Sequence, residues 1–392
     1  MLEKIYKRLD DLGLIIVIIS LLALLTHSYF RGLTILWVII GGLFIKRDGY
    51  KKIGLELPIF LYLVTLFLSL VSPLDLKHSY KEIYRHLFGF VAPFMLGQIT
   101  INEEKKKKYI GILIKIMIGY FFIKSNLMIF KFLPSKFGDR YVPLNINPVE
   151  FSYIGGVILL YIWTEFLKEK EKYKKIVDLI FVLAMGYVIL QTKTRGSWLG
   201  LVGAMMVVYI LKNNDTIKNI LKAIGTFLVV VVFGYIFRNS TWLSKYYNRL
   251  LSVSNTKTDY SNTARLIAWK MGMERFKERP FTGWGYKLKN PYPTGPGGAN
   301  QVLDHPHNEY VAYLVSGGII GLLGYLYLMI SILIKGLKNK ENMYWLIMLG
   351  ITTYTLIYGV VEALFQVSNS LFLFLVFLGI VVAEKRGIDE NN

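Results

Sequence analysis

The sequence contains no cysteine and comparatively few charged residues. Because cysteine is absent, disulfides and thiolate chemistry are excluded. Charged residues make up only 18% of the 392 residues, whereas apolar residues make up 54% and the mean hydropathy is +0.44. Soluble domains are on average about 25% charged. The composition therefore excludes a simple globular enzyme and predicts a polytopic membrane protein.

The apolar residues gather in runs long enough to cross a hydrocarbon layer about 30 Å thick, which takes roughly 20 helical residues. Each run is expected to be a helix, since only a helix satisfies its own backbone hydrogen bonds in lipid. We predict an all-α membrane protein with about twelve transmembrane helices and no internal repeat. The predicted spans are 12–27, 32–45, 54–72, 84–100, 109–130, 151–167, 176–191, 196–211, 218–237, 308–334, 343–362 and 367–383.

Lysine and arginine exceed aspartate and glutamate by 20 charges, and most of this surplus reflects topology, so no nucleic-acid partner is predicted. The positive-inside rule places the loops richest in cations, and with them both termini, in the cytoplasm. The first span follows Lys4, Lys7 and Arg8 without a small-residue cleavage site, so it is expected to be retained. The cation-rich loops are 46–52, 105–108, 168–175, 212–218 and 335–340.

One long loop, residues 238–307, interrupts the pattern and is predicted to lie outside the cytoplasm, between the helices of 1–237 and those of 308–392. Ser261 or Asn262 can cap a helix that runs to about Glu278. Its large apolar residues fall on one face, which predicts an amphipathic helix lying on the membrane or over a cavity. These residues are Leu266, Trp269, Met273 and Phe276. Segments 282–286 and 290–298 are rich in glycine and proline and are predicted to form a flexible lid.

Two places on the outer side combine cations with polar groups. The turn Thr192-Lys-Thr-Arg-Gly-Ser197 carries Lys193 and Arg195, and a guanidinium offers a planar fork suited to a phosphate or diphosphate. The alternative is that both cations pair with anionic lipid headgroups. Arg265 is predicted in the first turn of the loop helix, where the helix dipole also favours an anion. Its alternative is a solvated basic face.

The third place is His305-Pro-His307-Asn-Glu-Tyr310, which runs directly into the tenth predicted span. A histidine can accept a proton from a hydroxyl near neutral pH. As a metal site the motif is weak, because His-x-His with one carboxylate lacks the further ligands typical of zinc. We therefore predict a general base here and no metal.

These motifs together resemble those of the O-antigen ligase and polymerase superfamily. His307-Asn308, nine residues and then Gly318-Ile-Ile-Gly321 resembles the signature at the end of the family's large outer loop. Arg195 in Thr-Arg-Gly-Ser-Trp resembles its mid-chain arginine. The segment Arg265-x-x-x-Trp269, followed by Pro280-x-x-Gly283-x-Gly285, resembles its arginine helix and glycine turn (residues 280–285). The motifs cover about 190–325, and the span count and loop placement extend the similarity to the whole chain.

The resemblance implies a membrane glycosyltransferase that moves a glycan from undecaprenyl diphosphate to an acceptor sugar hydroxyl. Arg195 and Arg265 would stabilise the diphosphate leaving group, and His307 would act as the base. Asn308 or Glu309 would orient the imidazole or the acceptor. The other implied substrate-binding residues are Lys193, Tyr310 and Arg140.

The family also implies an inner-membrane location in bacteria with the site facing the periplasm, membrane lipids as partners, and no metal or cofactor. Lipid A–core is the favoured acceptor, although Leu322 stands where ligases often carry a small hydroxyl residue. A polymerase or a protein glycosyltransferase would use the same residues.

Two other classes remain open. A twelve-span secondary transporter fits the span count, and the predicted spans contain Lys115, Lys124 and Glu362. Such transporters usually show repeated halves, which this sequence lacks. A scaffold or flippase-associated protein without catalysis is the other alternative. Glycan transfer by purified protein, with and without chelator, separates these classes.

Overall fold

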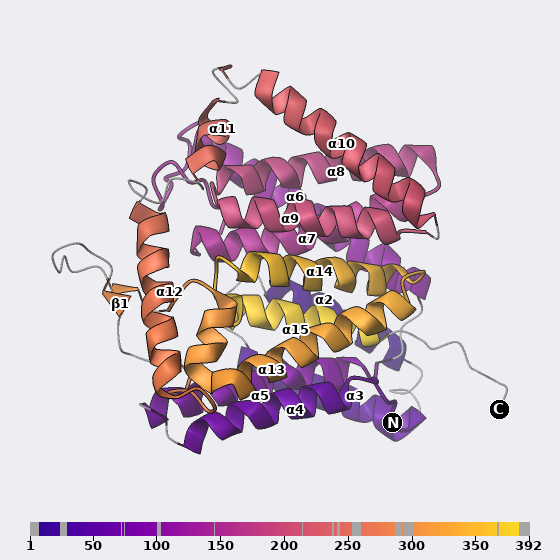
Figure 1. Ribbon diagram of the computed structural model, residues 1–392. Helices are drawn as coiled ribbons and strands as arrows, with labels where there is room; N and C mark the ends of the chain where they lie inside the picture. Colours follow the sequence, from indigo (N-terminus) through magenta and orange to yellow (C-terminus); the bar gives the residue numbers. More distant parts are fainter. Residues whose placement is uncertain are drawn as a thin grey trace.

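The computed structural model describes residues 8–23, 30–71, 73, 75–99, 103–144, 146–213, 215–236, 239–240, 244–252, 260–286, 292–293, 302–303, 305–366 and 368–383. Within these ranges the chain forms a bundle of roughly aligned helices, with one helix lying across an end of the bundle (Figure 1). The helices are α2 (Leu9–Ala23), α3 (Phe30–Asp48), α4 (Glu56–Leu68), η1 (Ser69–Val71), α5 (Leu76–Leu96), α6 (Glu103–Ile129), α7 (Pro148–Lys168), α8 (Lys172–Gln191), α9 (Arg195–Leu211), α10 (Thr216–Ile236), α11 (Ser244–Leu251), α12 (Tyr260–Glu278), α13 (Glu309–Lys338), α14 (Met343–Gly359), η3 (Leu364–Gln366) and α15 (Ser368–Val382). A pair of two-residue strands, β1 (Tyr292–Pro293) and β2 (Val302–Leu303), is antiparallel.

Every predicted span overlaps one described helix, so the all-helical architecture is confirmed. Among the described residues, three helices are both long and apolar enough to cross a membrane, at Glu104–Ile129, Pro148–Lys168 and Glu309–Lys338. Several others are apolar but shorter. The count of twelve crossing helices therefore stays a prediction.

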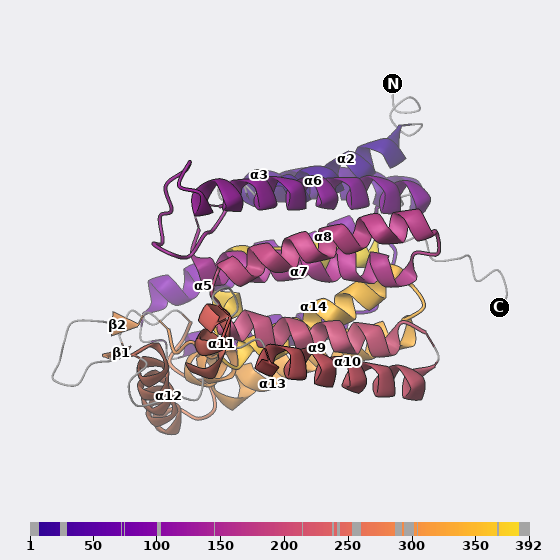
Figure 2. The same ribbon diagram turned by 90° about the horizontal axis from the view of Figure 1, so that it is seen from above.

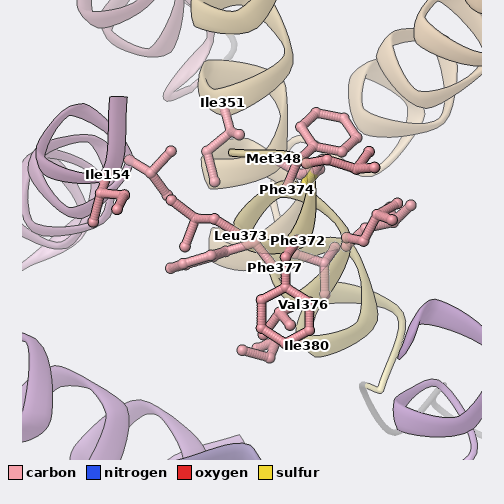
Figure 3. Close-up of a cluster of buried hydrophobic side chains, with 14 of the residues drawn as sticks. Ile154, Met348, Ile351, Phe372, Leu373, Phe374, Val376, Phe377 and Ile380 are labelled. Atoms are coloured by element: carbon pink, nitrogen blue, oxygen red, sulfur yellow. The ribbon is translucent and has the colours of Figure 1, made fainter. Parts of the chain in front are cut away.

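The centre of the bundle is formed by α7, α14 and α15. Ile154 of α7 faces Met348 and Ile351 of α14 across the apolar face of α15, which includes Phe374 (Figure 3). Farther toward the end of the bundle that holds α12, Tyr354 of α14 donates to the Ser152 carbonyl at 3.0 Å and shares a 2.6 Å hydrogen bond with the Ser197 hydroxyl. The start of α9 is thereby fixed against α7 and α14.

The long helix α13 is broken at Gly318, which has φ 63° and ψ −162°. A Cβ at this position would lie 2.3 Å from the Phe281 carbonyl group, so glycine alone fits. The Ile319 N–H donates to the Pro280 carbonyl at 2.8 Å. The break therefore brings α13 directly against the glycine turn.

The glycine turn satisfies the backbone groups that the break exposes. Gly283 has φ +66°, and a Cβ there would lie 2.6 Å from the Ser316 carbonyl. The next N–H groups, of Trp284 and Gly285, donate to the Val315 and Ser316 carbonyls at 2.8 and 2.9 Å. The two glycine motifs of the sequence thus interlock in space, and each explains the conformation of the other.

The loop helix α12 lies across the end of the bundle, and β1 lies beyond it (Figure 1). The predicted helix is present, but it packs through small residues, because Ala264 and Ala268 are buried and a Cβ on Gly272 would meet Val311 of α13 at 2.5 Å. Leu266, on the predicted apolar face, is 44% exposed. Most of the predicted lid segment 290–298 lies outside the described residues.

Candidate active site

The turn between α8 and α9 positions Arg195. Lys193 adopts a left-handed conformation with φ 54°, which ends α8 and reverses the chain. Arg195 is then the first residue of α9 and is buried, with 6% of its surface exposed. The unpaired N–H groups of a helix start add positive potential beside its guanidinium group.

Two of the predicted substrate-binding cations brace this turn. Arg140 donates from Nε to the Thr192 carbonyl at 2.7 Å and from Nη2 to the Thr194 hydroxyl at 2.9 Å. The Lys193 ammonium forms an ion pair with Asp139. Both cations therefore bind protein groups, and they would attract a bound anion mainly through their positive charge.

Further cations surround Arg140. Burial lowers the pKa of Arg140, Tyr358 opposes this effect, and the neighbouring charges of Arg249 and Arg265 lower it again. Arg249 lies on α11 and was not singled out from the sequence. A guanidinium stays charged under all ordinary conditions. This end of the bundle therefore concentrates positive charge, as an anion-binding site requires.

Arg195 joins the bundle to the loop. Its Nη1 donates to the Ser252 hydroxyl and its Nη2 donates to Asn262 Oδ1 at 3.0 Å. The amide of Asn262 also donates to the Ser252 carbonyl at 2.7 Å. These contacts fix the plane of the guanidinium group and hold α12 beside α9.

Arg265 lies three residues after Asn262 on α12, so the two residues share one face of that helix. Arg195 thus binds the face of α12 that also carries Arg265, and the convergence of the two arginines on one anion stays a prediction. The prediction that Arg265 lies in the first helical turn is wrong, because α12 already begins at Tyr260. Asn262 does not serve as the cap, since its side chain binds Arg195 and Ser252.

His307 is held by a carboxylate that the sequence did not assign to the site. Its Nδ1 lies 2.8 and 2.9 Å from the two carboxylate oxygens of Glu362. The His307 backbone has φ 48°, a strained conformation for a residue with a side chain. Its carbonyl accepts a hydrogen bond from Trp269 of α12 at 3.4 Å. The imidazole is therefore positioned from both α12 and the α14–α15 turn.

Glu362 is the centre of the site. Predicted inside a span, it instead follows the end of α14, is 2% exposed, and also faces His305 Nε2 at 3.6 Å and Arg265 Nη2 at 3.9 Å. Burial raises the pKa of Glu362, but the His307 hydrogen bond and the charges of His307, His305 and Arg265 outweigh it and lower the pKa to about 2. The carboxylate is therefore ionised and accepts a proton-bearing Nδ1.

The three residues after His307 are directed into the protein. Asn308 caps α13 by accepting from the Val311 N–H at 3.0 Å. Glu309 is fully buried and accepts from the Phe365 N–H at 3.0 Å. Tyr310 donates to the Leu356 carbonyl at 2.8 Å. The structure does not bring these side chains to the site, although their helix fixes His307.

His305, His307 and Glu362 could also supply three metal ligands, since their ligand atoms lie within 4.8 Å of one another. Two histidines and a glutamate form a known ligand set of catalytic zinc. Here both carboxylate oxygens already accept from His307, and the positive charge of Arg265 lies 3.9 Å away. This arrangement suits a charge-paired base better than a cation, and the absence of a metal stays a prediction.

The charged residues inside helices find partners within the bundle. The Lys115 ammonium lies 2.7 Å from Asp178 and 3.3 Å from Glu165. Lys124 donates to the Tyr120 hydroxyl at 3.0 Å. Of the three charged residues predicted within spans, Glu362 therefore lies in the candidate site and the two lysines bind groups within the bundle.

The comparisons with known proteins agree with this geometry. A protein-family model described as O-antigen ligase matches residues 180–326, a segment that contains Arg195, Arg265, His307 and both glycine motifs. A comparison with curated proteins finds no match. The resemblance recognised from the motifs is thereby confirmed. Residues 180–326 thus carry a domain of the O-antigen ligase superfamily, which supports a membrane glycosyltransferase of the O-antigen ligase or polymerase type.

Proposed function

We propose that this protein transfers a glycan from undecaprenyl diphosphate to a sugar hydroxyl, on the periplasmic side of a bacterial inner membrane. The observation that carries the proposal is the convergence of a base, a carboxylate and two arginines from separate segments. Glu362 contacts His307 and Arg265, and Arg195 is bonded to the same face of α12 as Arg265.

The two arginines are the reason for proposing a diphosphate as the leaving group. As the bond between the anomeric carbon and the diphosphate oxygen breaks, negative charge grows on the leaving group. Fixed guanidinium groups stabilise that charge more in the transition state than in the bound donor, which lowers the barrier. Asn262 and Ser252 hold Arg195 in place, so little reorganisation is needed during the reaction.

His307 provides the proton acceptor. With Nδ1–H donating to Glu362, the imidazole presents Nε2 as its basic nitrogen, and the carboxylate stabilises the imidazolium that forms. The acceptor hydroxyl oxygen attacks the anomeric carbon, its proton passes to Nε2 of His307, and the diphosphate leaves with the bonding electrons. The scheme requires no metal and no cofactor.

The topology follows the cation pattern. The α8–α9 turn, α12 and the start of α13 lie at one end of the bundle (Figure 1), opposite the ends that carry the lysine-rich loops. We propose that both termini are cytoplasmic. Reporter fusions at Asp215 and Arg279 should report inside and outside respectively, and the reverse pattern would contradict both topology and site.

Lipid A–core is the proposed acceptor, with another lipid-linked repeat unit as the alternative. Purified protein in lipid nanodiscs should move a radiolabelled glycan from undecaprenyl diphosphate to lipid A–core, with chelator present. Label on a longer lipid-linked chain would identify a polymerase, and label on protein a protein glycosyltransferase. No transfer to any acceptor would contradict the proposed function.

A further inference from the structure

An apolar cavity of about 300 Å³ lies between α7, α9 and α10, away from the active site. Helix α10 packs along α9 (Figure 2), and the cavity opens between them. Val202 on its rim is 45% exposed, so the cavity is a groove accessible from the side of the bundle. The lining residues are Trp163 of α7, Val202, Met205, Met206 and Tyr209 of α9, and Ala223 and Thr226 of α10.

Two of the three polar side chains that line this groove already donate hydrogen bonds within the protein. The indole N–H of Trp163 donates to the Met205 carbonyl at 3.1 Å. The Thr226 hydroxyl donates to the Lys222 carbonyl at 2.9 Å. The remaining wall consists of hydrocarbon, aromatic rings and thioethers, which adapt to irregular apolar shapes. Apart from the Tyr209 hydroxyl the lining is apolar, so the groove suits a hydrocarbon chain.

The position of the groove indicates which hydrocarbon chain it binds. Arg195, Leu199, Val202, Met206 and Tyr209 recur at the spacing that places residues on one face of a helix. The opposite face of α9, marked by glycines, packs on α14. At 1.5 Å per residue the groove begins about 10 Å and ends about 21 Å below Arg195. A lipid whose diphosphate is held at Arg195 would run its tail down this face.

We infer that the groove between α7, α9 and α10 binds the isoprenoid tail of the diphosphate donor. The inference rests on the proposed function, because that function places the diphosphate at Arg195. A phospholipid acyl chain would fit the same apolar walls, but the position of the groove on the face of α9 that begins with Arg195, about 10 Å farther along the helix, favours the donor. A lipid tail in a bilayer already lies in hydrocarbon, so the groove gains no free energy from removing it from water. Its contribution is to fix the position of the tail and to select its shape.

Filling the groove tests the inference. Val202→Trp places an indole at the rim, and Ile224→Trp is the matched control, because Ile224 is 49% exposed on α10 and does not line the groove. Transfer is compared for donors that carry a long isoprenoid or a tail of two isoprene units. We expect Val202→Trp to lose about tenfold in kcat/KM with the long donor and little with the short one. Equal losses with both donors, or the same loss in Ile224→Trp, would overturn the inference.

A second measurement separates this inference from the proposed function. A long-chain isoprenyl diphosphate with a diazirine in its tail is photolysed in nanodiscs containing the protein. Peptides of α9 and α10 should be labelled, less in Val202→Trp but equally in Ile224→Trp. Such labelling in a wild-type protein that transfers no glycan would support tail binding in the groove and contradict the proposed function. Normal transfer with labelling confined to other helices would overturn the inference that the groove binds the tail, and would leave the proposed function intact.

Discussion

The contact of Glu362 with three basic groups makes Glu362→Gln the most informative substitution. The amide keeps the size of the side chain but removes the charge that faces His307, His305 and Arg265. Lowering the pKa from its ordinary 4.5 to about 2 corresponds to roughly 3 kcal/mol of favourable interaction with the ionised form. This interaction orients the imidazole and stabilises the imidazolium, so we expect kcat to fall about 10²- to 10⁴-fold.

The donor KM of Glu362→Gln should change little, because in the proposed mechanism the arginines hold the diphosphate. The assay is transfer of labelled glycan in nanodiscs across a range of donor concentrations. Glu165→Gln is the matched control, since Glu165 is also buried but Asp178 continues to pair with Lys115. A near-normal kcat in Glu362→Gln, or an equal loss in Glu165→Gln, would refute the role of Glu362.

The same carboxylate predicts a pH dependence of stability. Because folding lowers the pKa of Glu362, its contribution is present above about pH 4.5 and is lost as the pH falls toward 2. The difference in unfolding midpoint between wild type and Glu362→Gln should therefore shrink over this range. A difference that stays constant from pH 6 to pH 3 would show that folding does not lower the pKa of Glu362.

Three further predictions concern the arginines, the histidines and the interlocked glycines. Arg195→Lys and Arg265→Lys should each lower the transfer rate about 10²–10³-fold, because lysine keeps the charge but loses the planar fork; near-normal transfer in both would contradict their role in stabilising the diphosphate. His307→Ala should abolish turnover while retaining donor binding, measured by isothermal titration, and His305→Ala should do less; full activity in His307→Ala would contradict its role as the base, and loss on chelation with recovery on adding zinc would establish the metal alternative. Gly318→Ala should lower the thermal unfolding midpoint, since its methyl group would overlap the Phe281 carbonyl, and an unchanged midpoint would contradict the interlock.

Features that depend on local pattern were predictable from the sequence. The apolar runs located the helices, because backbone hydrogen bonding and hydrophobic length are properties of a single segment. The positions of Arg195, Arg265 and His307 followed from their motifs. The structure brings all three to one end of the bundle, although each motif is separated from the next by tens of residues.

Features that depend on contacts between distant segments were not predictable. Glu362 pairs with a histidine 55 residues earlier, and its place at the end of an apolar run concealed that it lies beyond the helix. On α12 the sequence favoured a face of large apolar residues, but close approach to α13 selects Ala264, Ala268 and Gly272 instead. Asn262 has the chemistry of a helix cap, yet the buried Arg195 side chain competes for its oxygen.

The interlock between the glycine turn and the broken α13 has a mechanical consequence. The backbone bonds from residues 280–285 reach residues 315–316 before the break and residues 319–320 after it, and so join α12, through the turn that follows it, to both segments of α13 as one block. That block contains both Arg265 and His307, whereas Glu362 belongs to the α14–α15 turn and meets it through side chains. Any displacement of this block relative to the α14–α15 turn would therefore separate His307 and Arg265 from Glu362 together, so the imidazole and the guanidinium group would lose their shared carboxylate at once.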